Sequence, residues 1–299
     1  MQVLQQKVIK ITIKINDKEK TFTSENNSNK LSSDGLRVQA VIQYGAGNIA
    51  PTAQINIYGL SIETMTPLMR IQWNTMNAIK NTIRVEVGEK GDKVLSLAYE
   101  GNITFAKINM SNAPTTCLQI ESQMAVVEAL TPRDATTYSK GQDASEIIKE
   151  ICNSMGYQYE NNGASHILSD PVTLEGSYIS RIQKLCVDCD FDLYTEQRYI
   201  AICPRGGSRS IKIPILTPST GLRGYPSPDI RGLTFRCRFN PLVRFGGIVT
   251  IKDSLIPTAN GDWRTYGVRA ILESNSAQAR WEMEVSAVLR SSKDVAIAR

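Results

Sequence analysis

Histidine is almost absent from this sequence of 299 residues, in which His166 is the only one. It lies in a polar stretch between Asn161 and Asp170 that we expect to be a loop. Catalytic triads, histidine proton shuttles and multi-histidine metal sites each need more than one isolated loop histidine. The sequence therefore predicts no catalytic, metal-binding or cofactor-binding residue.

A long apolar run is also missing. No window reaches the roughly 18–20 apolar residues that a membrane-spanning helix needs. The chain starts Met-Gln-Val-Leu-Gln-Gln, without the apolar region of a secretion signal. We therefore expect a soluble protein, without a membrane span, that is made in a cytosol.

Cysteine is present, but not at the spacing of a zinc site. Cys186 and Cys189 form the only Cys-x-x-Cys pair, and a structural zinc site would need two further ligands nearby. A redox pair would open a helix, whereas this pair lies at the end of a predicted helix, with Cys186 on its apolar face. We interpret both residues as small buried thiols, reduced in a cytosol.

Other motifs of site chemistry are incomplete. Asp188, Asp190 and Asp192 resemble the first half of a calcium loop, but Leu193 and Tyr199 stand where glycine and glutamate are needed. The phosphate-binding glycine-lysine loop and the Gly-x-Ser-x-Gly elbow of hydrolases are absent from the sequence. These failures favour a solvated turn at the aspartates and a structural protein.

Charge is divided unevenly along the chain. From Arg205 onward there are 15 Lys and Arg against 7 Asp and Glu, a net charge of +8, while the preceding residues carry −3. A basic region can face nucleic acid or an acidic partner, and it can equally be a solvated face. Both interpretations stay open from the sequence.

The overall composition, 41% hydrophobic and 21% charged residues, is typical of a globular protein. In the first part of the chain, apolar residues alternate with polar ones at period two, which predicts half-buried strands. The predicted strands cover 9–15, 19–23, 36–44, 53–57, 83–87, 95–99, 103–108 and 118–127. One helix is predicted from Thr66 and Pro67, with Leu68, Ile71 and Ile79 on its apolar face. We predict a first β-domain over 1–132.

The pattern then changes to helices. Asp143-x-x-Glu146 resembles a capping box that opens a helix ending at Gly156. A second helix is predicted over 178–187, and a hairpin over 191–203. We predict a small α+β insert over 133–208.

Period-two alternation returns after residue 208. It predicts strands over 233–239, 248–251, 266–272 and 281–289. The sequence therefore predicts a second β-domain over 209–299, and a fold that is mainly β with an α+β insert.

Three segments of the last domain carry a family resemblance: Gly221–Pro226, Gly232–Pro241 and Leu242–Val249. They resemble the second tube-like barrel of phage baseplate hub proteins, of the late control D type and of Mu-like phages. In that family an apolar strand ends in Asn-Pro, as at Asn240 and Pro241 here. Phe245, Gly246 and Gly247 stand where Pro-Gly-Asp is usual, which puts the turn geometry in doubt.

The rest of the chain fits the same resemblance. The segments around Gly59 and Gly101 are similar to the first tube-like barrel, and 139–157 with 178–202 are similar to the helix-and-hairpin insert between the barrels. The resemblance implies two tail-tube-like β-barrel domains that flank the insert. It also implies that Gly59, Gly101, Asn240, Pro241, Gly246 and Gly247 are structural motif residues.

The resemblance implies a function without catalysis or cofactor. Three subunits with two barrels each would form a pseudo-sixfold ring, a symmetry adaptor between a hexameric tail tube and a trimeric spike. The implied partners are other copies of the chain, the tail tube or distal tube protein, the central spike, the tape-measure protein and baseplate wedge components, with DNA in transit through the channel. The implied location is the virion tail, assembled in the host bacterial cytoplasm. The alternatives are a tail-tip enzyme that degrades cell walls and a peptidoglycan-binding module.

Overall fold

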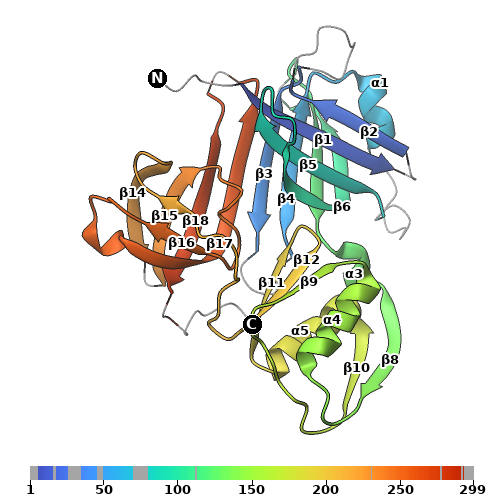
Figure 1. Ribbon diagram of the computed structural model, residues 1–299. Helices are drawn as coiled ribbons and strands as arrows, with labels where there is room; N and C mark the ends of the chain where they lie inside the picture. Colours follow the sequence, from blue (N-terminus) through green and yellow to red (C-terminus); the bar gives the residue numbers. More distant parts are fainter. Residues whose placement is uncertain are drawn as a thin grey trace. The chain divides into compact units, whose positions relative to one another are not determined.

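The computed structural model describes residues 6–15, 18–25, 35–45, 50–69, 80–111, 113–229, 231–276, 278–290 and 292. The chain divides into two compact units (Figure 1). Unit 1 consists of Met1–Gln43, Thr52–Met124 and Arg269–Glu282, and unit 2 of Tyr44–Pro51, Ala125–Val268 and Met283–Arg299. The domain division at 132 and 208 stays a prediction.

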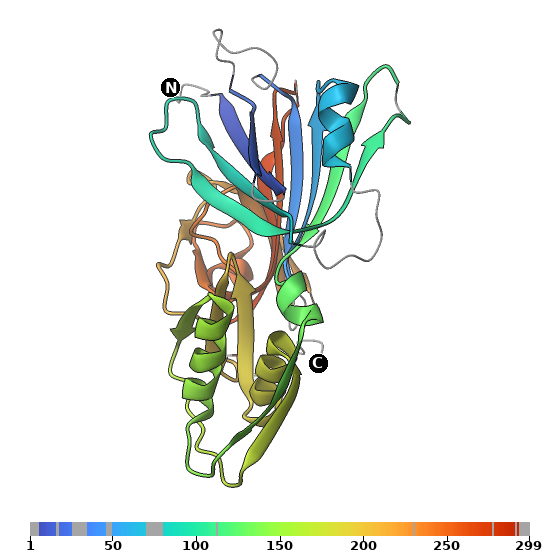
Figure 2. The same ribbon diagram turned by 90° about the vertical axis from the view of Figure 1, so that its right-hand side faces the viewer.

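Unit 1 is built on one antiparallel sheet, whose strands curve around a shared interior (Figure 2). Its strands are β1 (Lys7–Ile15), β2 (Lys18–Thr23), β3 (Val38–Tyr44), β4 (Thr52–Tyr58), β5 (Thr82–Glu89), β6 (Ser96–Asn109) and β7 (Cys117–Gln123). They pair in the order β3-β4-β7-β6-β5-β1-β2, and β17 (Gly261–Ser274) pairs with β3. The alternation predicted these strands, because Ile9, Ile11 and Ile13 of β1 are buried while Lys14 is exposed.

The predicted start of the helix in this unit is wrong. Helix α1 (Ile62–Met65) begins four residues before Thr66. The Ser61 hydroxyl accepts a hydrogen bond from the Thr64 N–H at 3.3 Å, so serine is the N-cap. Pro67 lies instead in the short 3-10 turn η1 (Thr66–Leu68). The predicted helical residues 70–79 lie outside the described residues.

Unit 2 contains the helix-bearing insert. Its elements are α3 (Val126–Leu130), β8 (Pro132–Tyr138), α4 (Ala144–Met155), β9 (Gln158–Asn161), β10 (Val172–Ser177), α5 (Tyr178–Asp188), β11 (Phe191–Glu196) and β12 (Tyr199–Pro204). The two predicted helices and the hairpin are confirmed, and α4 and α5 lie beside each other (Figures 1 and 2). The predicted strand over 118–127 is too long, because β7 ends at Gln123 and α3 follows.

The remaining strands of unit 2 belong to the same sheet, which has 13 strands in the described residues and continues through β17. They are β13 (Ile215–Leu216), β14 (Leu222–Asp229), β15 (Gly232–Arg238), β16 (Ile248–Ile251), the first part of β17, and β18 (Trp281–Leu289), with the 3-10 turn η2 (Pro257–Ala259) before β17. The strand order is β14-β15-β18-β17, and β16 pairs with β17 and β13. The predicted fold class, mainly β with a small helix-containing insert, is confirmed.

Candidate functional site

The glycine pair of the last domain lies against the insert hairpin. Gly246 has a φ of +77°, and a Cβ there would come within 2.6 Å of the Tyr194 ring. That ring, from β11, packs edge-on against Phe245 with centroids 5.1 Å apart. Gly247 is equally crowded, since a Cβ would lie 2.8 Å from Ile211 Cδ1. Glycine at 246 thus permits both the left-handed backbone and the close approach of the hairpin.

The Asn-Pro motif opens the turn that leads to this glycine pair. The Asn240 side-chain oxygen accepts the Leu242 N–H at 2.9 Å, and its backbone carbonyl accepts the Val243 N–H at 2.9 Å. An asparagine that bonds two residues ahead sets a tight turn, and Pro241 cannot extend the preceding strand. The motif therefore follows the end of β15 and turns the chain toward Gly246.

Local structure also explains why glycine stands at the two motif positions of unit 1. Gly59 ends β4 with a φ of +85°. Gly101 lies beside the buried hydrogen bond between Tyr99 Oη and Ser122 Oγ, which are 3.0 Å apart. A Cβ at Gly101 would collide with both side chains. The family role of these glycines stays a prediction.

A cluster of three arginines and three carboxylates, which we call the arginine joint, connects the insert to the segments of unit 2 that follow it. Its members are Glu160, Asp192, Glu196, Arg209, Arg244 and Arg264. The Arg209 side chain is only 1% exposed. Its Nη1 lies 2.7 Å from Glu196 Oε2, and its Nη2 lies 2.8 Å from Glu160 Oε2. Arg209 also donates to the Phe245 carbonyl at 3.3 Å, which ties the pair to the glycine turn.

The other two arginines complete the joint. Arg244 Nε lies 2.8 Å from Glu196 Oε2, so Glu196 accepts from two guanidinium groups. Arg264 donates to the Gly207 carbonyl at 2.7 Å and to Asp192 Oδ2 at 3.3 Å. A buried charged group is costly unless an opposite charge and hydrogen bonds accompany it. The ion pairs of the joint therefore hold its arginines and carboxylates in one arrangement.

Two carboxylates of the joint have shifted pKa values in opposite directions. Partial burial alone raises the pKa of Glu160, but the hydrogen bonds and charge of Arg209 outweigh it and hold the pKa below its ordinary value. For Asp192, burial dominates over the Gly206 N–H and Arg264 and raises the pKa. Glu160 is therefore held ionised by the joint, which is a structural role.

The joint also bears on the charge imbalance of the sequence. Arg209, Arg244 and Arg264 belong to the basic final third, and their carboxylate partners lie before residue 205. Part of the net charge of +8 after residue 205 is thus neutralised by carboxylates inside unit 2 and does not face solvent. A surface for nucleic acid would have to rely on the other basic residues.

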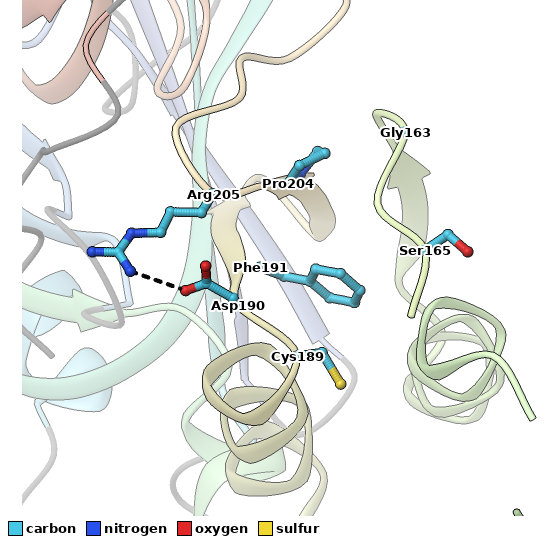
Figure 3. A pocket seen from close by; sticks show the side chains of 7 residues that line it. All are labelled: Gly163, Ser165, Cys189, Asp190, Phe191, Pro204 and Arg205. Atoms are coloured by element: carbon cyan, nitrogen blue, oxygen red, sulfur yellow. Dashed lines mark hydrogen bonds and ion pairs between the residues drawn. The ribbon is translucent and has the colours of Figure 1, made fainter. Parts of the chain in front are cut away.

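A hollow of about 440 Å3 opens in the insert (Figure 3). It is lined by Gly163, Ser165, Cys189, Asp190, Phe191, Pro204 and Arg205. The Phe191 ring and the Cys189 side chain point toward the Ser165 segment, while Arg205 pairs with Asp190 at 3.3 Å on the other side (Figure 3). Asp190 and Asp192 thus have separate partners. In the described part of the chain, no group of three or more His, Cys, Asp or Glu is placed to hold a metal ion.

The cysteines are inert in this fold. All six lie within the described residues, and each is buried and free. The prediction of buried thiols at Cys186 and Cys189 is confirmed. Burial raises the pKa of Cys152 and of Cys203 to about 12, so these thiols stay protonated at neutral pH.

His166 serves the start of helix α4 through its backbone. Its N–H donates to Asp143 Oδ1 at 3.2 Å, and the Ser165 hydroxyl donates to Asp143 Oδ2 at 2.6 Å. Asp143 is the N-cap and also accepts the Ser145 N–H at 2.8 Å. Slight burial raises the pKa of Asp143, but these hydrogen bonds outweigh it and lower the pKa overall. The loop therefore fixes a helix end.

The fold is similar to solved structures of tail proteins. The 43 kDa tail protein of prophage MuSo2 from Shewanella oneidensis matches with a TM-score of 0.60 and 8% identity, over 98% of this chain and 99% of that chain. A tail protein from Neisseria meningitidis MC58 matches with a TM-score of 0.60 and 10% identity, over 93% and 96%. The E. coli c3393 protein, a type VI secretion component, matches with a TM-score of 0.58 and 11% identity, over 91% and 79%.

Identities this low show a shared fold. A search of the curated proteins finds no match to this sequence. None of the helices in the described ranges is long and apolar enough to cross a membrane. The resemblance to baseplate hubs that the sequence predicted is confirmed by a family profile over residues 8–285, and the chain belongs to the family described as Baseplate hub gp41.

Proposed function

We propose that this chain is a non-enzymatic structural hub in the baseplate of a contractile phage tail or a phage-like device. The observation that carries the proposal is the extent of the match, since the hub family covers residues 8–285. A prophage tail protein shares the fold over 98% of the chain. The chemistry agrees with a structural role, because the carboxylates of the arginine joint are engaged by guanidinium groups.

The hub works as a homotrimer that adapts one symmetry to another. A hexameric tube and a trimeric spike can be joined by three subunits that each present two similar faces. In support, the chain divides into two compact units that are both rich in strands, and β17 and β18 contribute residues to both units. Three copies then supply six such units to a ring.

The partners of the hub are the tail tube or distal tube protein on one side and the central spike on the other. The tape-measure protein, baseplate wedge components and DNA in transit complete the set. The relative from E. coli supports a place in a tail assembly, because it is described as structurally similar to the T4 tail proteins gp27 and gp5. Assembly takes place in the host cytoplasm, and the mature location is the virion tail.

Native mass spectrometry of the purified chain tests the trimer. The predicted mass is three times the 33.1 kDa of one chain. A monomer or a dimer at micromolar concentration, with no trimer on addition of the spike protein, would contradict the proposal. A zymogram on peptidoglycan tests the non-enzymatic part, and a lytic band from the pure chain would contradict it.

A further inference from the structure

Three rows of side chains cross the outer face of β3, β4 and β7 in unit 1. The strand register places Gln39, Asn56 and Gln119 in one row, Val41, Gln54 and Glu121 in the next, and Gln43, Thr52 and Gln123 in the third. We call these nine residues the amide face. None of them is buried, whereas the residues between them on each strand point into the core.

The amide face is hollowed and carries only one formal charge. Six of its members line a hollow of about 460 Å3 together with residues that include Thr104 and Arg269. The charged side chains in that lining are Glu121 and Arg269, of opposite sign. Of the nine residues of the face itself, Glu121 alone is charged and six are amides. The face offers hydrogen-bond donors and acceptors with almost no net charge.

The same sheet is charged elsewhere. On the outer side of β1 and β5, Lys10 lies 3.1 Å from Glu86, and Arg84 lies 3.2 Å from Glu86. Surfaces that meet solvent usually carry such mixed charges. The low charge of β3, β4 and β7 is therefore a local property of these strands and not a property of the sheet as a whole.

Neutral amides suit a wall past which a polyanion must slide. Each lysine or arginine that contacts a phosphate releases counterions and tightens the binding, while carboxylates repel the phosphates. A neutral amide forms hydrogen bonds with water, and it neither binds phosphates through counterion release nor repels them by charge. A subunit interface would instead have an apolar and aromatic centre, and Val41 is the one apolar member of this face.

We propose that the amide face is the wall that unit 1 contributes to the channel through which DNA passes. This inference rests on the proposed hub function, which supplies the channel. It adds the residues that face the DNA and the reason for their chemistry, which is to let phosphates pass without being held.

Cysteine labelling in assembled tails tests the inference. The six native cysteines are buried, and labelling of the wild-type chain, in which Cys189 lines the hollow of the insert, is subtracted as background. The variants are Gln54→Cys on the amide face and Arg84→Cys on β5, both at exposed positions of the same sheet. Each is treated with a small maleimide and with a maleimide on a large polyethylene glycol, as free protein and in purified tails.

The expected result is size-selective protection. In tails, Gln54→Cys reacts with the small reagent and not with the large one, while the free variant reacts with both. Reaction with the large reagent at the rate of the free protein would overturn the inference, because the face would be outside. Loss of both reactions would overturn it as well, because the face would lie in a protein interface. Absence of the wild-type chain from tails would instead refute the hub function.

A second measurement adds charge to the wall. Gln54→Lys combined with Gln123→Lys is expected to slow DNA release from triggered particles several-fold, and added salt is expected to relieve the delay. Thr12→Lys adds a positive charge on the outer side of β1 and serves as the control, with release at the wild-type rate. An equal delay in the control, or none in the double variant, would contradict the inference.

Discussion

Glu196 is the residue on which the arginine joint depends most. Its side chain is only 4% exposed, and its Oε2 atom accepts from both Arg209 and Arg244. Two buried or half-buried guanidinium groups share one carboxylate, so loss of that carboxylate leaves positive charge inside unit 2 without compensation. The joint is therefore sensitive to single substitutions at this position.

Replacement of Glu196 by glutamine is expected to lower the free energy of unfolding by about 3–5 kcal/mol, because it breaks a buried pair from one side. Urea unfolding measures this change. The matched control is Glu284→Gln, which removes the surface partner of Arg236, whose side chain is 64% exposed. The control should change stability by less than about 1 kcal/mol. Equal effects of the two substitutions would contradict the account of the joint.

Glu160 gives the joint a dependence on pH. Its folded-state pKa is held below the ordinary value by Arg209, so its contribution to stability is present above the ordinary pKa of about 4.3. The contribution is lost as pH falls through the folded pKa. Asp192, whose pKa is raised, acts in the opposite direction and is common to wild type and to a Glu160 variant.

The stability difference between wild type and Glu160→Gln is therefore expected to be largest near pH 7 and to shrink below about pH 4. Thermal unfolding at a series of pH values measures it. Glu146→Gln removes an exposed carboxylate on helix α4 that pairs with Lys149, and it should give a small difference at each pH. A Glu160→Gln difference that grows in acid would contradict the assigned direction of the pKa shift.

At the scale of elements, period-two alternation predicts the strands that bury one face and misses the strands that do not. Strands β1, β3, β4, β15 and β18 have one buried and one exposed face, which is the condition under which alternation is visible. Strand β8 is exposed at almost every residue, and β14 contains Pro226 and Pro228, so neither has the pattern. The sequence could not predict these two strands because nothing in their composition favours one.

The arginine joint could not be predicted for a different reason. Arg209 meets Glu160 across 49 positions of sequence and Glu196 across 13, and no motif marks such a pairing. The excess of arginine after residue 205 was visible, but its partners were set by the way β11 packs beside the glycine turn. By contrast, Gly246 could be predicted from the family resemblance, although its reason, contact with Tyr194, could not.

The glycine turn gives a prediction at this scale. Gly246→Ala is expected to cost about 2–4 kcal/mol, from the left-handed backbone together with the clash with Tyr194. Gly224→Ala is the matched control, because Gly224 has a φ of +64° and a Cβ there would meet nothing within 4 Å. The control should cost about 1–2 kcal/mol.

The two contributions at Gly246 can be separated in urea unfolding experiments. In a Tyr194→Ala background, Gly246→Ala should lose its steric part and cost no more than the Gly224 control. An unchanged cost in that background would show that the Tyr194 ring is not the reason for glycine at position 246.

At the scale of the whole molecule, the chain is an assembly part whose known features are its fold and its family. The hub family covers residues 8–285, and strands of both units belong to one sheet, which has 13 strands in the part of the chain that the structure describes. The cysteines are buried, and the Glu196 carboxylate of the arginine joint is paired with arginine. These groups stabilise the fold. The arginine joint holds the insert to the later segments of unit 2 through buried ion pairs.

The most direct test of the central claim is cryo-EM of the tail tip at a resolution that allows the chain to be traced. We expect three copies around the tail axis, between the last ring of the tube and the spike, with six units arranged around the channel. Density that traces this chain outside the axis, in another copy number, or nowhere in the tail would contradict it.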